Sequence, residues 1–152
     1  MSLNNPRPVK VIEVKVDLPE VYPVILFQEI EPPYRTLRFS IGTSEAISIS
    51  MALKKISAPR PLTHDLFADV LKEFEIMVET VRITGKKDGN YRCELVLSNA
   101  RFGNKIIDCR PSDGIALALR QQMYVPIVVE ESLFDQVQTD VDIDSIKQSE
   151  VE

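Results

Sequence analysis

A chain of 152 residues, 44% apolar and 27% charged, is long enough for one globular domain with its own core. No apolar run approaches the roughly 20 residues that span a bilayer, and the amino-terminal residues lack the pattern of a signal peptide. We therefore expect a cytoplasmic protein with no membrane partner. A net charge of −5 excludes an overall basic field of the kind that gives tight non-specific nucleic-acid binding.

The acidic charge is concentrated at the end of the sequence. Between residues 135 and 152, six acids stand against Lys147, which accounts for the whole net charge. Residues 1–134 have equal numbers of acidic and basic side chains, so the net charge does not exclude a local basic groove. We predict a flexible leader over residues 1–8, a single domain over 9–137 and a frayed acidic tail over 138–152.

Seven segments have the alternating or short apolar pattern of β-strands. In chain order they are residues 9–16, 22–30, 35–41, 78–84, 91–97, 105–109 and 126–129. The Asp88-Gly89 pair between the fourth and fifth segments predicts a tight hairpin.

Helical spacing of apolar residues predicts three helices and one short helical turn. They begin near Thr43, Thr63, Pro111 and Glu131. Hydroxyl side chains are expected to cap the first three: Thr43 or Ser44, then Thr63, then Ser112 with Asp113. The third helix is apolar on most faces, which predicts that it is buried.

A weak internal repeat connects the first and third helices. The segment SEAISI starts at Ser44, 68 residues before SDGIAL at Ser112, and each follows three predicted strands. The order of elements predicts an α+β fold in which a mostly antiparallel sheet carries helices on one side, as a duplicated βββα unit. The alternative is that capped amphipathic helices resemble one another.

Ionisable side chains gather at the three helix starts. They are Glu45; Arg60, His64 and Asp65; and Asp108, Arg110 and Asp113. A structural explanation is available for each, because an acid in a first turn stabilises a helix by about 0.3–1 kcal/mol and an arginine can hold a turn by a salt bridge. A chemical explanation starts from the same groups. Phosphodiester hydrolysis needs an activated water and positive charge near the phosphoryl oxygens, and nucleases often hold divalent ions with carboxylates.

Other chemistry has less support. The chain has no P-loop, no dinucleotide fingerprint and no nucleophile elbow. One histidine and two cysteines cannot make an ordinary structural zinc site. In a reducing compartment, Cys93 and Cys109 are better explained as two small buried apolar residues than as a disulfide or a metal pair.

Three blocks, in this order and spacing, resemble the bifunctional nuclease family of bacteria and plants. They are Ile41-Gly42 with Glu45-Ala46, then RPLTHDL from Arg60, then DxRPSDxIALALR from Asp108. The resemblance covers Val9 to Val137 and implies a compact α+β domain with nuclease activity on RNA and DNA. Gly114 is one departure, because the family usually has alanine there.

The resemblance and the charged clusters together predict a low-specificity nuclease that uses Mg²⁺ or Mn²⁺. The candidate catalytic residues are His64, Asp65, Asp108 and Asp113, and the three aspartates are also the candidate metal ligands. The candidate substrate-binding residues are Arg60, Arg110, Ser112 and Arg120. The alternative is a non-catalytic binding or regulatory module whose charges form structural salt bridges. Nucleic acid is the expected partner, and a homo-oligomer stays open.

Overall fold

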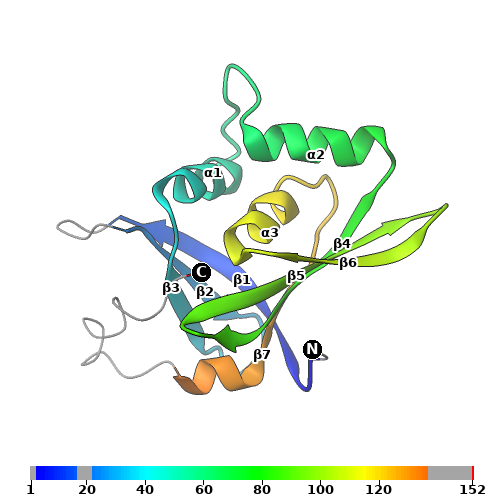
Figure 1. Cartoon of the computed structure of the whole chain (residues 1–152). Helices are drawn as coiled ribbons and strands as arrows, with labels where there is room; N and C mark the ends of the chain where they lie inside the picture. Colours follow the sequence, from blue (N-terminus) through cyan, green and yellow to red (C-terminus); the bar gives the residue numbers. More distant parts are fainter. Residues whose placement is uncertain (1–2, 17–21, 137–151) are drawn as a thin grey trace.

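The computed structural model describes residues 3–16, 22–136 and 152. Seven strands form one sheet in the order β3-β2-β1-β7-β4-β5-β6 (Figure 1). Neighbouring strands are antiparallel except β4 and β7, which are parallel. In chain order the strands are β1 (Pro6–Lys15), β2 (Val24–Glu29), β3 (Thr36–Ser40), β4 (Met77–Lys87), β5 (Asn90–Asn99), β6 (Gly103–Cys109) and β7 (Ile127–Glu130).

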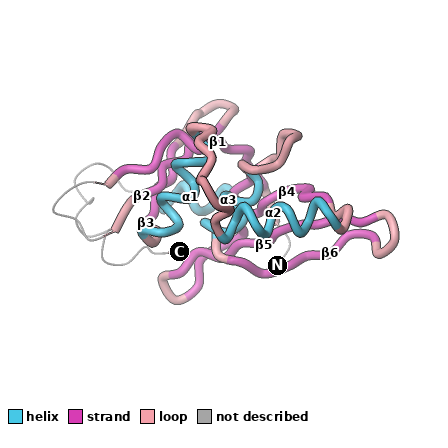
Figure 2. Tube along the Cα trace, turned by 90° about the horizontal axis from the view of Figure 1, so that it is seen from above, coloured by secondary structure: helices cyan, strands magenta, loops and turns pink. Residues whose placement is uncertain are grey.

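The helices α1 (Thr43–Leu53), α2 (Thr63–Glu73) and α3 (Pro111–Ala118) lie on one side of the sheet (Figure 1). Viewed from above, α1 lies on the side of β2 and β3, α2 runs along β4 and β6, and α3 lies between the two helices (Figure 2). A 3-10 helix, η1 (Glu131–Gln136), follows β7. The predicted α+β fold with a mostly antiparallel sheet is confirmed.

Helix α3 is the centre of the core. It contacts α1, α2, β4 and β5, and seven of its eight residues are buried. This confirms the burial that its nearly all-apolar sequence predicts. Helix α2 is different, because only Leu71 is buried while Leu66, Phe67 and Val70 are exposed. The expectation of a homo-oligomer stays a prediction.

The three helices begin without the expected hydroxyl caps. The residues at their N-cap positions are Gly42, Leu62 and Arg110, and none makes a side-chain capping bond. The predicted caps at Thr43 or Ser44, Thr63 and Ser112 are therefore wrong. At the start of α2, the carboxylate of Asp65 instead accepts a hydrogen bond of 2.9 Å from the backbone N–H of Leu62.

The structure bears on the amino-terminal boundary of the predicted domain but not on its carboxyl-terminal boundary. Strand β1 begins at Pro6 and its first residues pair with β7, so residues 6–8 of the predicted leader lie in the sheet. Residues 138–151 of the predicted tail lie outside the described residues. The element order runs βββα twice with α2 between, but a duplication of the unit stays a prediction. In the described part, no helix is long and apolar enough to cross a membrane.

A buried ion-pair network is centred on Glu29. The Glu29 side chain, at the end of β2, has no exposed surface. Its Oε1 accepts hydrogen bonds from Arg7 Nε at 2.8 Å and from Arg35 Nη2 at 2.9 Å. Arg35 Nη2 also donates to Glu131 Oε1 of η1 at 3.0 Å. The network therefore ties β1, β2 and η1 to the segment before β3.

Candidate functional site

His64 is clamped between two neighbouring helices. Its Nδ1 lies 2.6 Å from Ser48 Oγ of α1, and its Nε2 lies 2.9 Å from Asp113 Oδ1 of α3. The imidazole comes from the first turn of α2, so three helices meet at this one side chain. Only 14% of the histidine side chain is exposed.

The two partners assign the protons of the ring. An ionised carboxylate only accepts hydrogen bonds, so Nε2 carries a proton that it donates to Asp113. In neutral His64 the other nitrogen, Nδ1, is then an acceptor for the Ser48 hydroxyl. The hydrogen bond from His64, together with Arg110, outweighs burial and lowers the pKa of Asp113 from 3.8 to about 2. Asp113 is therefore a carboxylate near neutral pH.

Arg110 connects Asp113 to helix α1. Its Nε donates to Asp113 Oδ2 at 2.9 Å, and its Nη2 lies 3.1 Å from Asp113 Oδ1 and 3.0 Å from Glu45 Oε1. The arginine side chain is 54% exposed. Hydrogen bonds to Asp113, with a smaller contribution from Glu45, raise the pKa of Arg110 above its ordinary value. The guanidinium is therefore charged and oriented, but it already has carboxylate partners.

These side chains open into a common cavity of about 390 Å³. Its lining residues come from α1, the start of α2 and the start of α3: Ser44, Glu45, Ile47, Ser48, Leu62, Thr63, His64, Arg110 and Asp113. Charged or ionisable side chains from all three predicted helix starts therefore line one cavity: Glu45, His64, Arg110 and Asp113. Arg110 is the one arginine or lysine among these lining residues.

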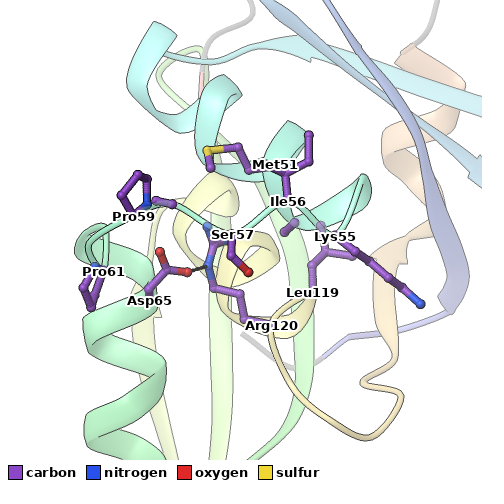
Figure 3. A pocket seen from close by; sticks show the side chains of 11 residues that line it. Met51, Lys55, Ile56, Ser57, Pro59, Pro61, Asp65, Leu119 and Arg120 are labelled. Atoms are coloured by element: carbon purple, nitrogen blue, oxygen red, sulfur yellow. Dashed lines mark hydrogen bonds and ion pairs between the residues drawn. The ribbon is translucent and has the colours of Figure 1, made fainter.

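A second charged pair, Asp65 and Arg120, joins the first turn of α2 to the segment that follows α3. Arg120 Nε donates to Asp65 Oδ1 at 2.7 Å, and its other nitrogens donate to the carbonyls of Ala116 and Ser48. The hydrogen bond from Arg120 lowers the pKa of Asp65. Both side chains line another pocket, of about 530 Å³, together with Pro59 and Pro61 of the loop between α1 and α2 (Figure 3). The pair holds this loop and α2 against α3.

A family model described as the bifunctional nuclease domain matches residues 24–142. The chain belongs to this family. Uncharacterized proteins from two strains of Mycobacterium tuberculosis, CDC 1551 and H37Rv, are each 36% identical to it over 128 residues. The match covers 84% of this chain and 74% of each relative. The family description names a nuclease, while both relatives are described as uncharacterized.

Within this bifunctional nuclease domain, the other predicted site residues lie apart from the His64 cavity. Asp108 is exposed on β6 and makes no hydrogen bond or ion pair with the described residues. Its neighbour Cys109 faces α3, so Asp108 points to the opposite face of the sheet. Arg60 is exposed, and it too makes no such contact within the described part of the chain.

Ser112 is buried under a carboxylate from the far end of the sequence. Its N–H donates to Glu152 Oε2 at 2.8 Å, and the Glu152 N–H donates to the Ser40 carbonyl at 3.2 Å. The Ser112 hydroxyl is fully buried and makes no hydrogen bond of normal geometry to the described residues. Burial raises the pKa of Glu152. Ser112 is thus buried and is not among the residues that line the His64 cavity.

The predicted metal ligands do not fit a divalent ion. The described residues contain no group of three or more histidine, cysteine, aspartate or glutamate side chains that could hold one. Asp113 is engaged by His64 and Arg110, and Asp65 is engaged by Arg120 and the Leu62 N–H. Asp108 points to the other face of the sheet. The three aspartates therefore do not converge on one point where they could bind the same ion.

We expect that millimolar Mg²⁺ or Mn²⁺ leaves the melting temperature of the protein unchanged. A ligand raises the melting temperature only if it binds the native state more tightly than the unfolded chain. Differential scanning fluorimetry of chelator-treated protein, with and without each ion, measures this. A melting temperature that Mn²⁺ raises in the wild type but not in Asp113→Asn would contradict the expectation and restore Asp113 as a ligand.

Sequence reasoning missed one member of the site, Ser48. It lies inside α1 among apolar neighbours and is 4% exposed. A buried hydroxyl on the core face of an apolar helix is the signal that was present, because buried polar groups usually have a partner. Nothing in the local sequence indicates that this partner is His64.

Proposed function

We propose that the protein is a low-specificity nuclease that hydrolyses RNA and DNA phosphodiesters at the His64 cavity. The family description supports the activity. The observation that carries the assignment to this cavity is the chain of hydrogen bonds from Ser48 through His64 to Asp113. A hydroxyl, an imidazole and a carboxylate in this order are a general-base system, because the carboxylate stabilises the imidazolium that forms.

His64 Nδ1 is the basic atom of the proposed reaction. A water in the cavity gives its proton to the Ser48 hydroxyl, and Ser48 passes its own proton to Nδ1. Asp113 holds the Nε2–H and stabilises the positive ring. Arg110, half exposed among the lining residues, supplies positive charge for the phosphoryl oxygens. No step requires a second histidine, which agrees with the single histidine of the sequence.

The test is cleavage of labelled RNA and DNA by purified protein, with matched variants. His64→Gln should lower the cleavage rate by roughly 10²–10⁴-fold, the usual contribution of a general base. Ser48→Ala should also lower it. Asp69→Asn, on the exposed face of α2, is the control and should cleave at the wild-type rate. Equal cleavage by the wild type and His64→Gln would identify a contaminating nuclease and refute the assignment.

One observation favours a second candidate, a non-catalytic binding or regulatory module. Asp113 and Arg110 at the His64 cavity, and Asp65 and Arg120 at the second pocket, each have a partner of opposite charge, as residues in structural salt bridges would. In that case the variants alter stability alone, and neither RNA nor DNA is cleaved above the background of a mock purification. The same assay therefore decides between the two candidates.

A further inference from the structure

The two cysteines are direct cross-strand partners. Cys93 of β5 is opposite Cys109 of β6 in the antiparallel register. Directly opposed residues have Cα atoms roughly 4.5–5.5 Å apart and side chains on the same face, and a disulfide spans roughly 4.4–6.8 Å. Both are free thiols in this structure. The backbone thus already has the spacing that a disulfide requires.

Both sulfur atoms also face the same point of α3. A Cβ atom added to Gly114 would lie 3.3 Å from Cys109 Sγ and 3.5 Å from Cys93 Sγ. It would also lie 3.1 Å from Val81 Cγ1, closer than most Cβ contacts in proteins. Glycine at this position therefore leaves room for two sulfurs beneath the helix.

The two thiols differ in access and in acidity. Cys93 is completely buried, whereas Cys109 is partly exposed at the end of the edge strand β6. The hydrogen bond between the two thiols lowers the pKa of Cys109 and, together with burial, raises that of Cys93. Because the thiolate is the nucleophile in thiol–disulfide exchange, Cys109 is the attacking residue and Cys93 the resolving one.

We propose that Cys93 and Cys109 form a redox-active dithiol that a low-molecular-weight disulfide oxidises to a cross-strand disulfide. The Cys109 thiolate attacks one sulfur of the oxidant, breaks its S–S bond and releases one small thiolate. Cys93 then loses its proton and attacks Cys109 Sγ, which forms the Cys93–Cys109 bond and releases the second small thiolate. Two protein thiols are oxidised, and one small disulfide is reduced to two small thiols.

The dithiol lies beside the charged site but does not depend on the proposed nuclease function. Cys109 precedes Arg110 in the chain, and Gly114 follows Asp113. The dithiol is inferred from strand register, the sulfur contacts, and the unequal access and acidity of the two thiols. Its test therefore measures thiols and mass, with no activity readout.

The experiment treats the native full chain with oxidised glutathione and counts free thiols after denaturation. In the wild type the count should fall from two to zero, the intact mass should fall by two hydrogen atoms, and dithiothreitol should restore both thiols. Cys93→Ser should stop at a mixed disulfide that carries glutathione on Cys109. Cys109→Ser should keep its buried thiol. The wild-type measurement stands by itself if either variant fails to fold.

Three results would overturn the proposal. The first is a wild type that keeps both thiols at an excess of oxidant. The second is a wild type that stops at a mixed disulfide, because Cys93 then does not reach Cys109. The third is a disulfide that joins two chains, seen as a dimer on a non-reducing gel. Each result is distinct from the monomeric, glutathione-free product expected.

Discussion

Replacing Glu29 by glutamine should lower the free energy of unfolding by about 3 kcal/mol. Removing one partner of a buried ion pair costs roughly 3–5 kcal/mol, because the remaining charge loses its compensation. The lower end applies here, since Arg7 and Arg35 keep 18% and 28% of their side chains exposed to water. Urea denaturation of the variant and the wild type measures the change.

Glu13→Gln is the matched control for this variant. Glu13 is 42% exposed and pairs with Lys15 at 3.3 Å. An exposed pair contributes little, so the free energy of unfolding should change by about 0.5 kcal/mol or less. If Glu29→Gln costs no more than Glu13→Gln, the network does not stabilise this end of the sheet.

The wild type and Glu29→Gln also test how the stability from Glu29 depends on pH. Burial would raise the pKa of Glu29, but hydrogen bonds from Arg35 and Arg7 lower it from 4.5 to about 2. A carboxyl whose pKa is lower in the folded state stabilises the fold above its unfolded pKa, and this stabilisation disappears as the pH falls through the folded pKa. The stability difference between wild type and Glu29→Gln should therefore be full above pH 4.5 and shrink towards pH 2.

Asp113→Asn should lower the free energy of unfolding by about 2 kcal/mol and the melting temperature by about 4–8 °C. The folded-state pKa of Asp113 is lowered to about 2 from 3.8, so its ionised form is stabilised by folding. Asparagine leaves His64 without its anionic partner and removes one of the carboxylate partners of Arg110, which keeps Glu45. Thermal unfolding followed by circular dichroism measures the loss.

Asp69→Asn serves as the control, because it makes the same chemical change at an exposed position of α2 that has no hydrogen bond or ion pair with the described residues. The stabilisation from Asp113 should be present above pH 3.8 and disappear as the pH falls towards 2. A variant as stable as Asp69→Asn would mean that the clamp on His64 does not hold the three helices together. The loss of stability is expected for a nuclease and for a binding module alike, so activity must be compared on folded protein.

The strands and helices were predictable because their signals are local. The alternation in β1, the Asp88-Gly89 hairpin and the apolar α3 each follow from neighbours a few residues apart. The hydroxyl caps were not predictable in the same way. The N-cap of each helix lies one or two residues before the predicted hydroxyl, so the N-cap residues are Gly42, Leu62 and Arg110. Asp65 and Asp113 then took arginine partners.

The sequence by itself determined the α+β elements, the family and the clustering of acids, arginines and His64 at the helix starts. Only the tertiary structure decided which groups meet. Ser48, His64 and Asp113 come from three helices, and Cys93 faces Cys109 through strand register. The periodicity of apolar residues shows which face of a helix or strand is buried, but it does not show which elements pack together or how far apart they lie. Those distances are set when α3 packs between α1, α2 and the sheet.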